Sequence, residues 1–172
     1  MKLDEAIKTA IDYESRVHRV YVEAEREAKS EVGKRVFRTL RDEERQHLEY
    51  LRERLREWTE SGRVNVVKLT TSIPTREAIS REVEKLRSAV GQKINESLDK
   101  EIEALKRALE VEDETSRFYE EMVRTLDADG QALFRGFVEV ERGHKAIVQA
   151  EIDCVTGSGY WFDMPEIRLE MG

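Results

Sequence analysis

The chain has 172 residues, a formal net charge of −7 and a single cysteine. This length suffices for one domain with a buried core. The acidic balance argues against nucleic acid or an anionic membrane as a partner, and a lone cysteine excludes an internal disulfide and CxxC metal knuckles. No apolar stretch approaches the roughly 18 residues of a membrane span, and the N-terminus lacks the apolar region of a signal peptide, so we expect a cytoplasmic protein.

Two helices are predicted in the first part of the chain. The first covers residues 2–30, where apolar residues recur at alternating steps of about three and four, and Glu14 interrupts this stripe at a position that should face the core. The second follows a weak break and ends at Ser61-Gly62. The gaps in its apolar stripe are occupied by Glu44 and His47.

A connection of different character follows the second helix. Residues 63–73 are rich in β-branched side chains and lack a helical period, which predicts an extended segment. Thr75 is a candidate N-cap for a further helical stretch, and Gly91 is expected to interrupt that stretch. We therefore predict a long crossover over residues 61–92.

Two more helices are predicted after the crossover. The third main helix runs from about residue 93 to residue 126, with Glu112 inside its apolar stripe. A turn at residues 127–130, with N-cap candidates at Asp127 and Asp129, leads to the fourth helix. That helix runs from about residue 131 to residue 155 and has Glu141 and His144 in the gaps of its stripe. The bundle is thus expected to span residues 1–155. The aromatic tail, residues 156–172, is expected to pack on the bundle or on a partner subunit.

The two halves of the chain repeat one another. A shift of 98 positions places the first helix on the third, and a shift of 97 places the second helix on the fourth. The pairs that coincide include Glu14 with Glu112, Tyr21 with Tyr119, Glu44 with Glu141 and His47 with His144. This pattern predicts an all-α four-helix bundle made of two repeated helix hairpins that are joined by a long crossover.

The positions of four glutamates indicate a metal centre. Each predicted helix carries one glutamate inside its apolar stripe, and the stripes converge on one core. Ionised carboxylates in that core would be very costly unless they were protonated, paired with basic side chains or bound to cations. Lys and Arg are nearly absent from the stripes, and two divalent cations would balance four carboxylates. A buried polar network without metal is the alternative.

The histidines fit the same interpretation. Residues three apart share a helix face, so Glu44 with His47, and Glu141 with His144, can aim at one point. Mixed carboxylate and imidazole ligands suit iron or manganese, and this arrangement is known from di-iron and di-manganese bundles. Two iron ions per chain are therefore expected, with manganese as the other possibility.

Two tyrosines repeat at the same distance from the glutamates. Tyr21 and Tyr119 each follow a candidate ligand by two helical turns, after Glu14 and Glu112 respectively. Their hydroxyls either orient a ligand carboxylate or belong to core side chains that are satisfied elsewhere. The other charged residues of the run from Arg41 to Arg45 are expected to form a solvated face.

The motifs resemble those of the rubrerythrin branch of the ferritin-like superfamily. The segments that carry the resemblance are Tyr13–Tyr21, Glu43–His47, Glu112–Tyr119, Glu139–His144 and the tail Gly159–Glu166. The resemblance implies a ferritin-like fold and chemistry with hydrogen peroxide or dioxygen at a di-iron site. It implies six ligands, which are Glu14, Glu44, His47, Glu112, Glu141 and His144.

Two departures from that family pattern matter. Rubrerythrins usually carry a rubredoxin domain with four cysteines, which this chain lacks, so electrons would come from a separate donor protein. They also usually have a further glutamate three residues after the ligand of the third helix, where this chain has Thr115. That difference puts a rubrerythrin-type peroxidase mechanism in doubt.

Three classes of function follow from these observations. The first is a redox enzyme that reduces peroxide or dioxygen at a bridged di-iron centre, with Glu44 and Glu141 as bridges. The second is iron handling by ferroxidase activity with transport or storage. The third is a helical scaffold whose metal is structural or absent, and a di-manganese catalase is a minor further option. A homodimer is expected by analogy of fold.

Overall fold

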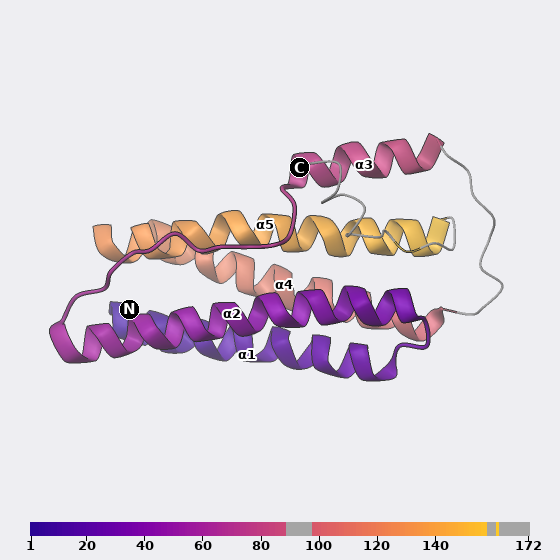
Figure 1. Ribbon diagram of the computed structural model, residues 1–172. Coiled ribbons are helices and arrows are strands. Elements are labelled where there is room, and N and C mark those ends of the chain that lie inside the picture. Colours follow the sequence, from indigo (N-terminus) through magenta and orange to yellow (C-terminus); the bar gives the residue numbers. More distant parts are fainter. Residues whose placement is uncertain (89–97, 158–160, 162–172) are drawn as a thin grey trace.

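The computed structural model describes residues 1–88, 98–157 and 161. Five helices and no strand occur in these ranges (Figure 1). Their bounds are α1 Leu3–Glu27, α2 Glu31–Ser61, α3 Arg76–Ser88, α4 Asp99–Thr125 and α5 Ala128–Gly157. None of the described helices combines the length and the apolar character that would let it cross a membrane.

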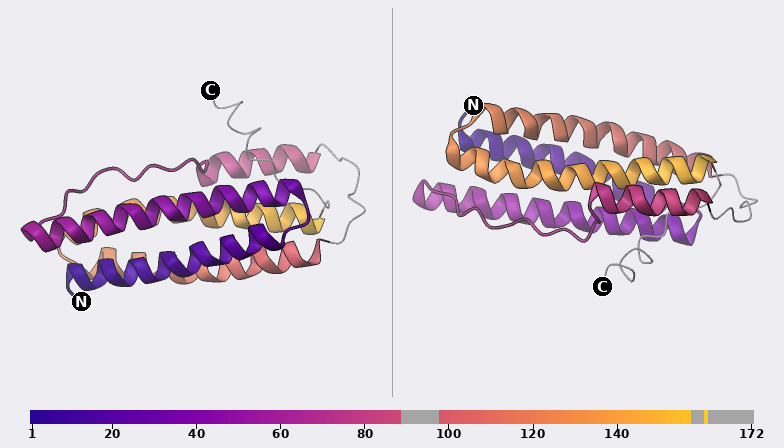
Figure 2. Two further views of the ribbon diagram at one scale, coloured as in Figure 1. Left: turned by 60° about the horizontal axis from the view of Figure 1, so that its bottom comes forward. Right: turned by 90° about the horizontal axis from the view of Figure 1, so that it is seen from above.

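Four long helices form a bundle of two hairpins. Helix α1 packs against α2, α4 packs against α5, and the hairpins meet where α1 contacts α4. The short helix α3 lies outside this bundle against α5 (Figures 1 and 2). The predicted all-α architecture of two hairpins joined by a long crossover is confirmed.

Local capping explains where the helices of the first hairpin end. Ser30 caps α2, because its hydroxyl accepts a hydrogen bond from the backbone N–H of Gly33 at 3.3 Å. Gly62 ends α2 in the left-handed region at φ 67°, which glycine adopts without steric cost. Glu101 of α4 accepts hydrogen bonds from the N–H groups of Lys29 and Ser30, at 2.7 and 3.3 Å. This carboxylate fixes the loop between α1 and α2.

The starts of the later helices differ in part from prediction. Thr75 caps α3 as expected, because its hydroxyl accepts from the N–H of Ala78 at 3.3 Å. The predicted turn at 127–130 is wrong, since α5 begins at Ala128. Asp127, one of the two expected N-cap candidates, caps the helix, because its carboxylate accepts a hydrogen bond from the N–H of Gly130 at 3.0 Å. The expected break at Gly91 and the expected helix start near residue 93 lie outside the described residues.

The apolar core consists of two clusters along the bundle axis. On α1, Ala10 belongs to one cluster and Val17 to the other, with Glu14 between them in sequence. The same order recurs on the other long helices, where each interrupting glutamate lies between residues of the two clusters. The flanking pairs are Leu51 and Leu40 on α2, Phe118 and Ala108 on α4, and Phe137 and Ile147 on α5. A polar layer therefore divides the core.

The segment between α2 and α3 forms no helix or strand, in agreement with the predicted extended connection. Side chains of α2 hold it in place. The Tyr50 hydroxyl donates to the carbonyl of Val67 at 2.7 Å, and the guanidinium of Arg54 donates to the carbonyl of Asn65 at 2.6 Å. From here on, residues 62–75 are called the crossover segment.

The first two residues of the predicted tail, Thr156 and Gly157, belong to the end of α5, and Trp161 is the one described residue beyond that helix. Its ring packs edge-on against Phe37 of α2, with 5.7 Å between centroids. A Cβ at Gly33 would lie 2.5 Å from the Trp161 ring, so glycine at this position permits the close approach. The rest of the tail lies outside the described residues, so its predicted packing on the bundle or a partner stays a prediction.

Candidate metal centre

The six residues proposed as ligands from the sequence meet in the polar layer. The four long helices together supply these residues, and the exposed fraction of each of the six side chains is 0%. The helical period explains the convergence, because each residue replaces an apolar one on the stripe that faces the core. They are Glu14 on α1, Glu44 and His47 on α2, Glu112 on α4, and Glu141 and His144 on α5.

The histidines face the glutamates through their Nδ1 atoms. Nδ1 of His47 lies 3.2 Å from Glu14, 3.5 Å from Glu44 and 3.7 Å from Glu141. Nδ1 of His144 lies 2.8 Å from Glu44 and 3.8 Å from Glu112. The two imidazole rings stack at 5.1 Å with an interplanar angle of 13°.

Three overlapping groups have the geometry of cation sites, two of them drawn from the six residues alone and a third that joins Glu43 to His47 and His144. In the first, Glu14, Glu44 and His47 bring one ligand atom each within 4.8 Å of one another. In the second, Glu44, Glu112 and His144 do the same. Glu44 belongs to both of these groups, so its two carboxylate oxygens can serve two neighbouring cations.

Unsatisfied polar atoms indicate that cations fit this layer. Such atoms are costly when buried, and folded proteins contain few of them. Nδ1 of His144 lies 2.8 Å from Oε1 of Glu44, yet neither atom makes a hydrogen bond. Two ligand atoms that point at one ion have this arrangement. The buried atoms without a hydrogen-bond partner include both carboxylate oxygens of Glu44 and Glu141, Oε2 of Glu112, Nε2 of His47 and both ring nitrogens of His144.

Protein cations do not neutralise the layer. Among the side chains that the structure describes, Arg54 is the one buried Lys or Arg. Its guanidinium binds the carbonyl of Asn65 and forms an ion pair with Glu57 at 3.0 Å, outside the six-residue group. The donor set of carboxylates and imidazoles therefore suits iron or manganese, as expected from the sequence.

In the metal-free protein, the buried carboxyl and imidazole groups of the layer have shifted pKa values. Burial raises the pKa of Glu14, but His47 with Glu44 and Tyr119 outweighs burial and lowers this pKa to about 2. Burial and the nearby Glu14 raise the pKa of Glu44 well above its usual range. Burial lowers the pKa of His144, but the carboxylates of Glu43 and Glu44 outweigh burial and raise this pKa to about 10.

Burial and the carboxylates of Glu112 and Glu14 likewise raise the pKa of Glu141 well above its usual range. These shifts favour the neutral form of Glu44 and Glu141 and the charged form of His144 in the metal-free protein. Metal binding at such a site would be coupled to the release of protons.

Each tyrosine hydroxyl binds a glutamate of the opposite hairpin. Tyr21 on α1 donates to Oε1 of Glu112 on α4 at 2.6 Å, and Tyr119 on α4 donates to Oε1 of Glu14 on α1. Both rings are fully buried. Of the two alternatives that the sequence left open, the contacts match hydroxyls that orient the candidate carboxylates.

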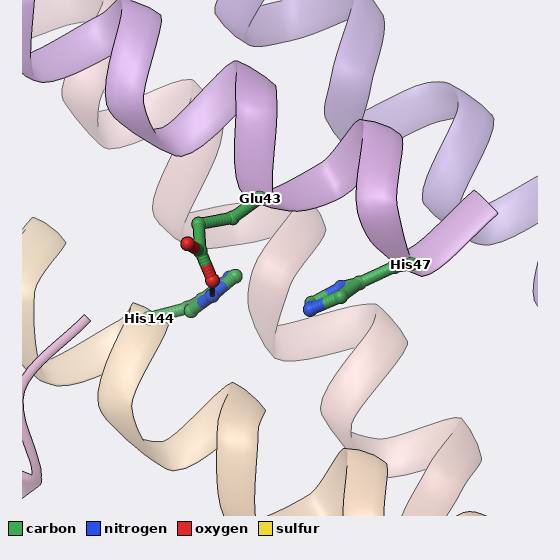
Figure 3. Close-up of side chains that lie close together, drawn as sticks. All are labelled: Glu43, His47 and His144. Atoms are coloured by element: carbon green, nitrogen blue, oxygen red, sulfur yellow. Dashed lines mark ion pairs between the residues drawn. The ribbon is translucent and has the colours of Figure 1, made fainter. Parts of the chain in front are cut away.

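Glu43 is a buried residue that sequence reasoning missed. We expected the charged neighbours of Glu44 to be solvated, and for Glu43 this is wrong, because its exposed fraction is 1%. Its carboxylate accepts hydrogen bonds from Thr71 and Ser72 of the crossover segment and lies 3.9 Å from Nε2 of His144 (Figure 3). Burial raises the pKa of Glu43, but His144, Ser72 and Thr71 outweigh it and hold the pKa at about 2.

Aromatic side chains cover one side of the layer. Phe137 packs edge-on against His47 at 5.5 Å, and Tyr119 lies 4.9 Å from Phe137. Thr115, at the place of the further glutamate of rubrerythrins, donates its hydroxyl to the carbonyl of Val111 at 2.8 Å. Threonine has no carboxylate, and its hydroxyl is used within its own helix rather than in the layer.

A comparison with protein families agrees with the geometry. The family model described as rubrerythrin matches residues 5–152, which covers all four long helices and the six-residue group. No curated protein and no solved structure matches the chain.

Proposed function

This chain belongs to the rubrerythrin family, and we propose that it is a di-iron protein that reduces hydrogen peroxide or dioxygen with electrons from a separate donor protein. The observation that carries the proposal is one fully buried layer of carboxylates and imidazoles, in which most of the side-chain oxygen and nitrogen atoms have no hydrogen-bond partner. The proposed ligands are Glu14, Glu44, His47, Glu112, Glu141 and His144.

The geometry suggests how the ligands would divide between two ions. Glu14 and His47 would hold one ion, Glu112 and His144 would hold the other, and Glu44 would bridge them. Glu141 is proposed as the second bridge because it faces ligands of both ions. Its carboxylate lies 3.7 Å from Nδ1 of His47, and its pKa is raised by burial and by the charge of Glu112. When bound, two ferrous ions supply the electrons that reduce an O–O bond.

The protein itself prepares the site in three ways. Hydrogen bonds from Tyr21 and Tyr119 hold Glu112 and Glu14 in position, as partners of ligands commonly do. The Phe137 ring packs edge-on against His47 and covers that side of the fully buried imidazole. The raised pKa values of Glu44 and Glu141 favour protonated carboxyls before metal binds, so metal binding would release protons.

Iron oxidation is a second candidate, and Thr115 favours it. The Thr115 hydroxyl binds its own helix, so the ligand set is the plain one of six residues without a further carboxylate from α4. In this alternative, ferrous ions are the substrate and dioxygen is the oxidant. The rate of oxidation by each oxidant separates the two candidates.

The first test measures metal content. The wild-type chain should contain about two irons, determined by mass spectrometry of protein purified without added metal, and Glu44→Ala/His47→Ala should lose them. Arg45→Ala/Glu49→Ala is the matched control, because these side chains lie on the same helix and are 57% and 68% exposed. If wild-type protein binds no iron even when ferrous ions are added anaerobically, the di-iron proposal is wrong.

The second test measures reactivity. The anaerobically loaded ferrous protein is mixed with either hydrogen peroxide or dioxygen, and the rise of ferric absorbance is followed by stopped flow. Faster oxidation by peroxide supports the peroxidase activity. Faster oxidation by dioxygen, with continued turnover of added ferrous ions, supports iron oxidation.

A further inference from the structure

The two copies of the metal motif differ where they meet the crossover segment. Residues 43–47 and 140–144 agree at three positions and differ at two, where Glu43 corresponds to Val140 and Gln46 to Gly143. Gln46 is exposed. A Cβ at Gly143, in contrast, would lie 3.2 Å from the carbonyl oxygen of Pro74.

Glu43 is held almost entirely by the crossover segment. Its Oε2 accepts a hydrogen bond from the Thr71 hydroxyl at 2.6 Å. Its Oε1 accepts from the backbone N–H of Ser72 at 2.9 Å and also from the Ser72 hydroxyl. Because three donors fix both oxygens, the position of this carboxylate depends on the docking of residues 71 and 72.

The Glu43 carboxylate also faces Nε2 of His144, the ring nitrogen opposite the one that faces the glutamates of the layer. Nε2 of His144 lies 3.9 Å from Oε2 of Glu43 (Figure 3). Nδ1 of the same ring faces Glu44 and Glu112. A carboxylate behind a ligating imidazole orients the ring and raises its basicity. In the second copy of the motif the corresponding residue is Val140, which has no polar side-chain group.

We propose that Glu43 is a positioning residue for His144 and that it links docking of the crossover segment to filling of the metal position that His144 completes. The inference rests on the proposed metal function. Linkage of this kind is reciprocal. Metal binding at that position tightens the crossover segment, and a docked crossover segment strengthens binding of that metal ion.

Two variants test the linkage without altering any of the six proposed ligands. Thr71→Ala/Ser72→Ala removes both hydroxyl donors from Glu43, and Glu43→Gln removes the charge behind His144. Tyr50→Phe is the matched control, because it removes a different hydrogen bond to the crossover segment, at Val67.

Anaerobic titration with Fe²⁺, followed by calorimetry, measures the affinity of each position. We expect both variants to weaken one of the two positions by about 10- to 100-fold, as loss of a partner to a ligand does, and to leave the other unchanged. Tyr50→Phe should leave both affinities unchanged. Equal weakening of both positions, or no change in either, would overturn the proposal while leaving the di-iron function intact.

Hydrogen exchange measures the reciprocal effect, which is the effect of metal binding on the crossover segment. Addition of Fe²⁺ to wild-type protein should slow exchange of the Ser72 amide, which donates to Glu43, by about tenfold, and Glu43→Gln should abolish this slowing. Wild-type exchange that is the same with and without bound Fe²⁺ would overturn the linkage. A wild-type chain that binds no Fe²⁺ overturns both this inference and the proposed function.

Discussion

The hydroxyl of Tyr21 donates a hydrogen bond of 2.6 Å to Oε1 of Glu112, a residue of the opposite hairpin. The reverse pair joins Tyr119 to Glu14. The two hairpins are therefore tied together at the polar layer by a reciprocal exchange of hydroxyl donors. A tyrosine of one hairpin controls the position of a proposed ligand on the other.

Removing either hydroxyl should destabilise the metal-free protein. In Tyr21→Phe or Tyr119→Phe, a buried carboxylate oxygen loses its donor, so we expect the free energy of unfolding to fall by about 1–3 kcal/mol. Urea unfolding measures this change. Tyr50→Phe is the control, since its hydroxyl binds a backbone carbonyl at an exposed position. Equal small losses in all three variants would contradict a special role for the buried pair.

Replacing Glu141 should separate stability from metal binding. Both of its carboxylate oxygens are buried without a hydrogen-bond partner, so Glu141→Met should stabilise the metal-free protein by about 1–3 kcal/mol. The same variant should lose one or both Fe²⁺ ions and the stabilisation that bound metal gives the wild type. Glu139→Met, whose side chain is 72% exposed, is the control. A metal-free Glu141→Met protein less stable than the wild type would refute the prediction.

The metal-free protein should lose stability as pH rises above neutrality. The carboxylates around His144 raise its pKa from the ordinary value of 6.5 to about 10. The folded state thus holds this proton more tightly than the unfolded chain, so the stabilisation is complete below pH 6.5 and is lost as pH rises through about 10. The raised pKa of Glu44 acts in the same direction. Urea unfolding across this window measures the loss, and stability that does not change with pH would contradict it.

Stability should also fall in acid. The pKa values of Glu14 and Glu43 drop from 4.5 to about 2 in the folded protein. Their stabilisation is therefore complete above pH 4.5 and is lost as pH falls towards 2. Unfolding of metal-free Glu43→Gln should depend less on pH in this window than unfolding of the wild type.

Two glycines of α5 should respond to alanine with opposite signs. At Gly136 a Cβ would lie 3.9 Å from Leu69, an ordinary contact, so Gly136→Ala should stabilise the helix by about 0.5–1 kcal/mol. At Gly143 a Cβ would lie 3.2 Å from the backbone oxygen of Pro74, so Gly143→Ala should cost about 1–3 kcal/mol through displacement of the crossover segment. Thermal unfolding of both variants checks the signs, and stabilisation by both would show that the crossover segment yields without cost.

The sequence by itself determined the helices and identified the residues that meet in the polar layer. A glutamate in an apolar stripe must face the core, because the helical period leaves it no other direction. That rule located Glu14, Glu44, Glu112 and Glu141, and the repeat connected them with the two Glu-x-x-His motifs. The start of α5 was predicted less well: the helix begins at Ala128 rather than near residue 131, because the cap at Asp127 fixes its first residue.

Tertiary structure decided which partner each polar side chain takes. Tyr21 could satisfy its hydroxyl on its own hairpin or across the bundle, and only the packing of α1 on α4 selects Glu112. Glu43 lies beside other charged residues and has no apolar pattern of its own, so its burial depends on the crossover segment that covers it. Contacts between residues far apart in the chain are set by how the hairpins and the crossover segment dock, and a helical period carries no information about that docking.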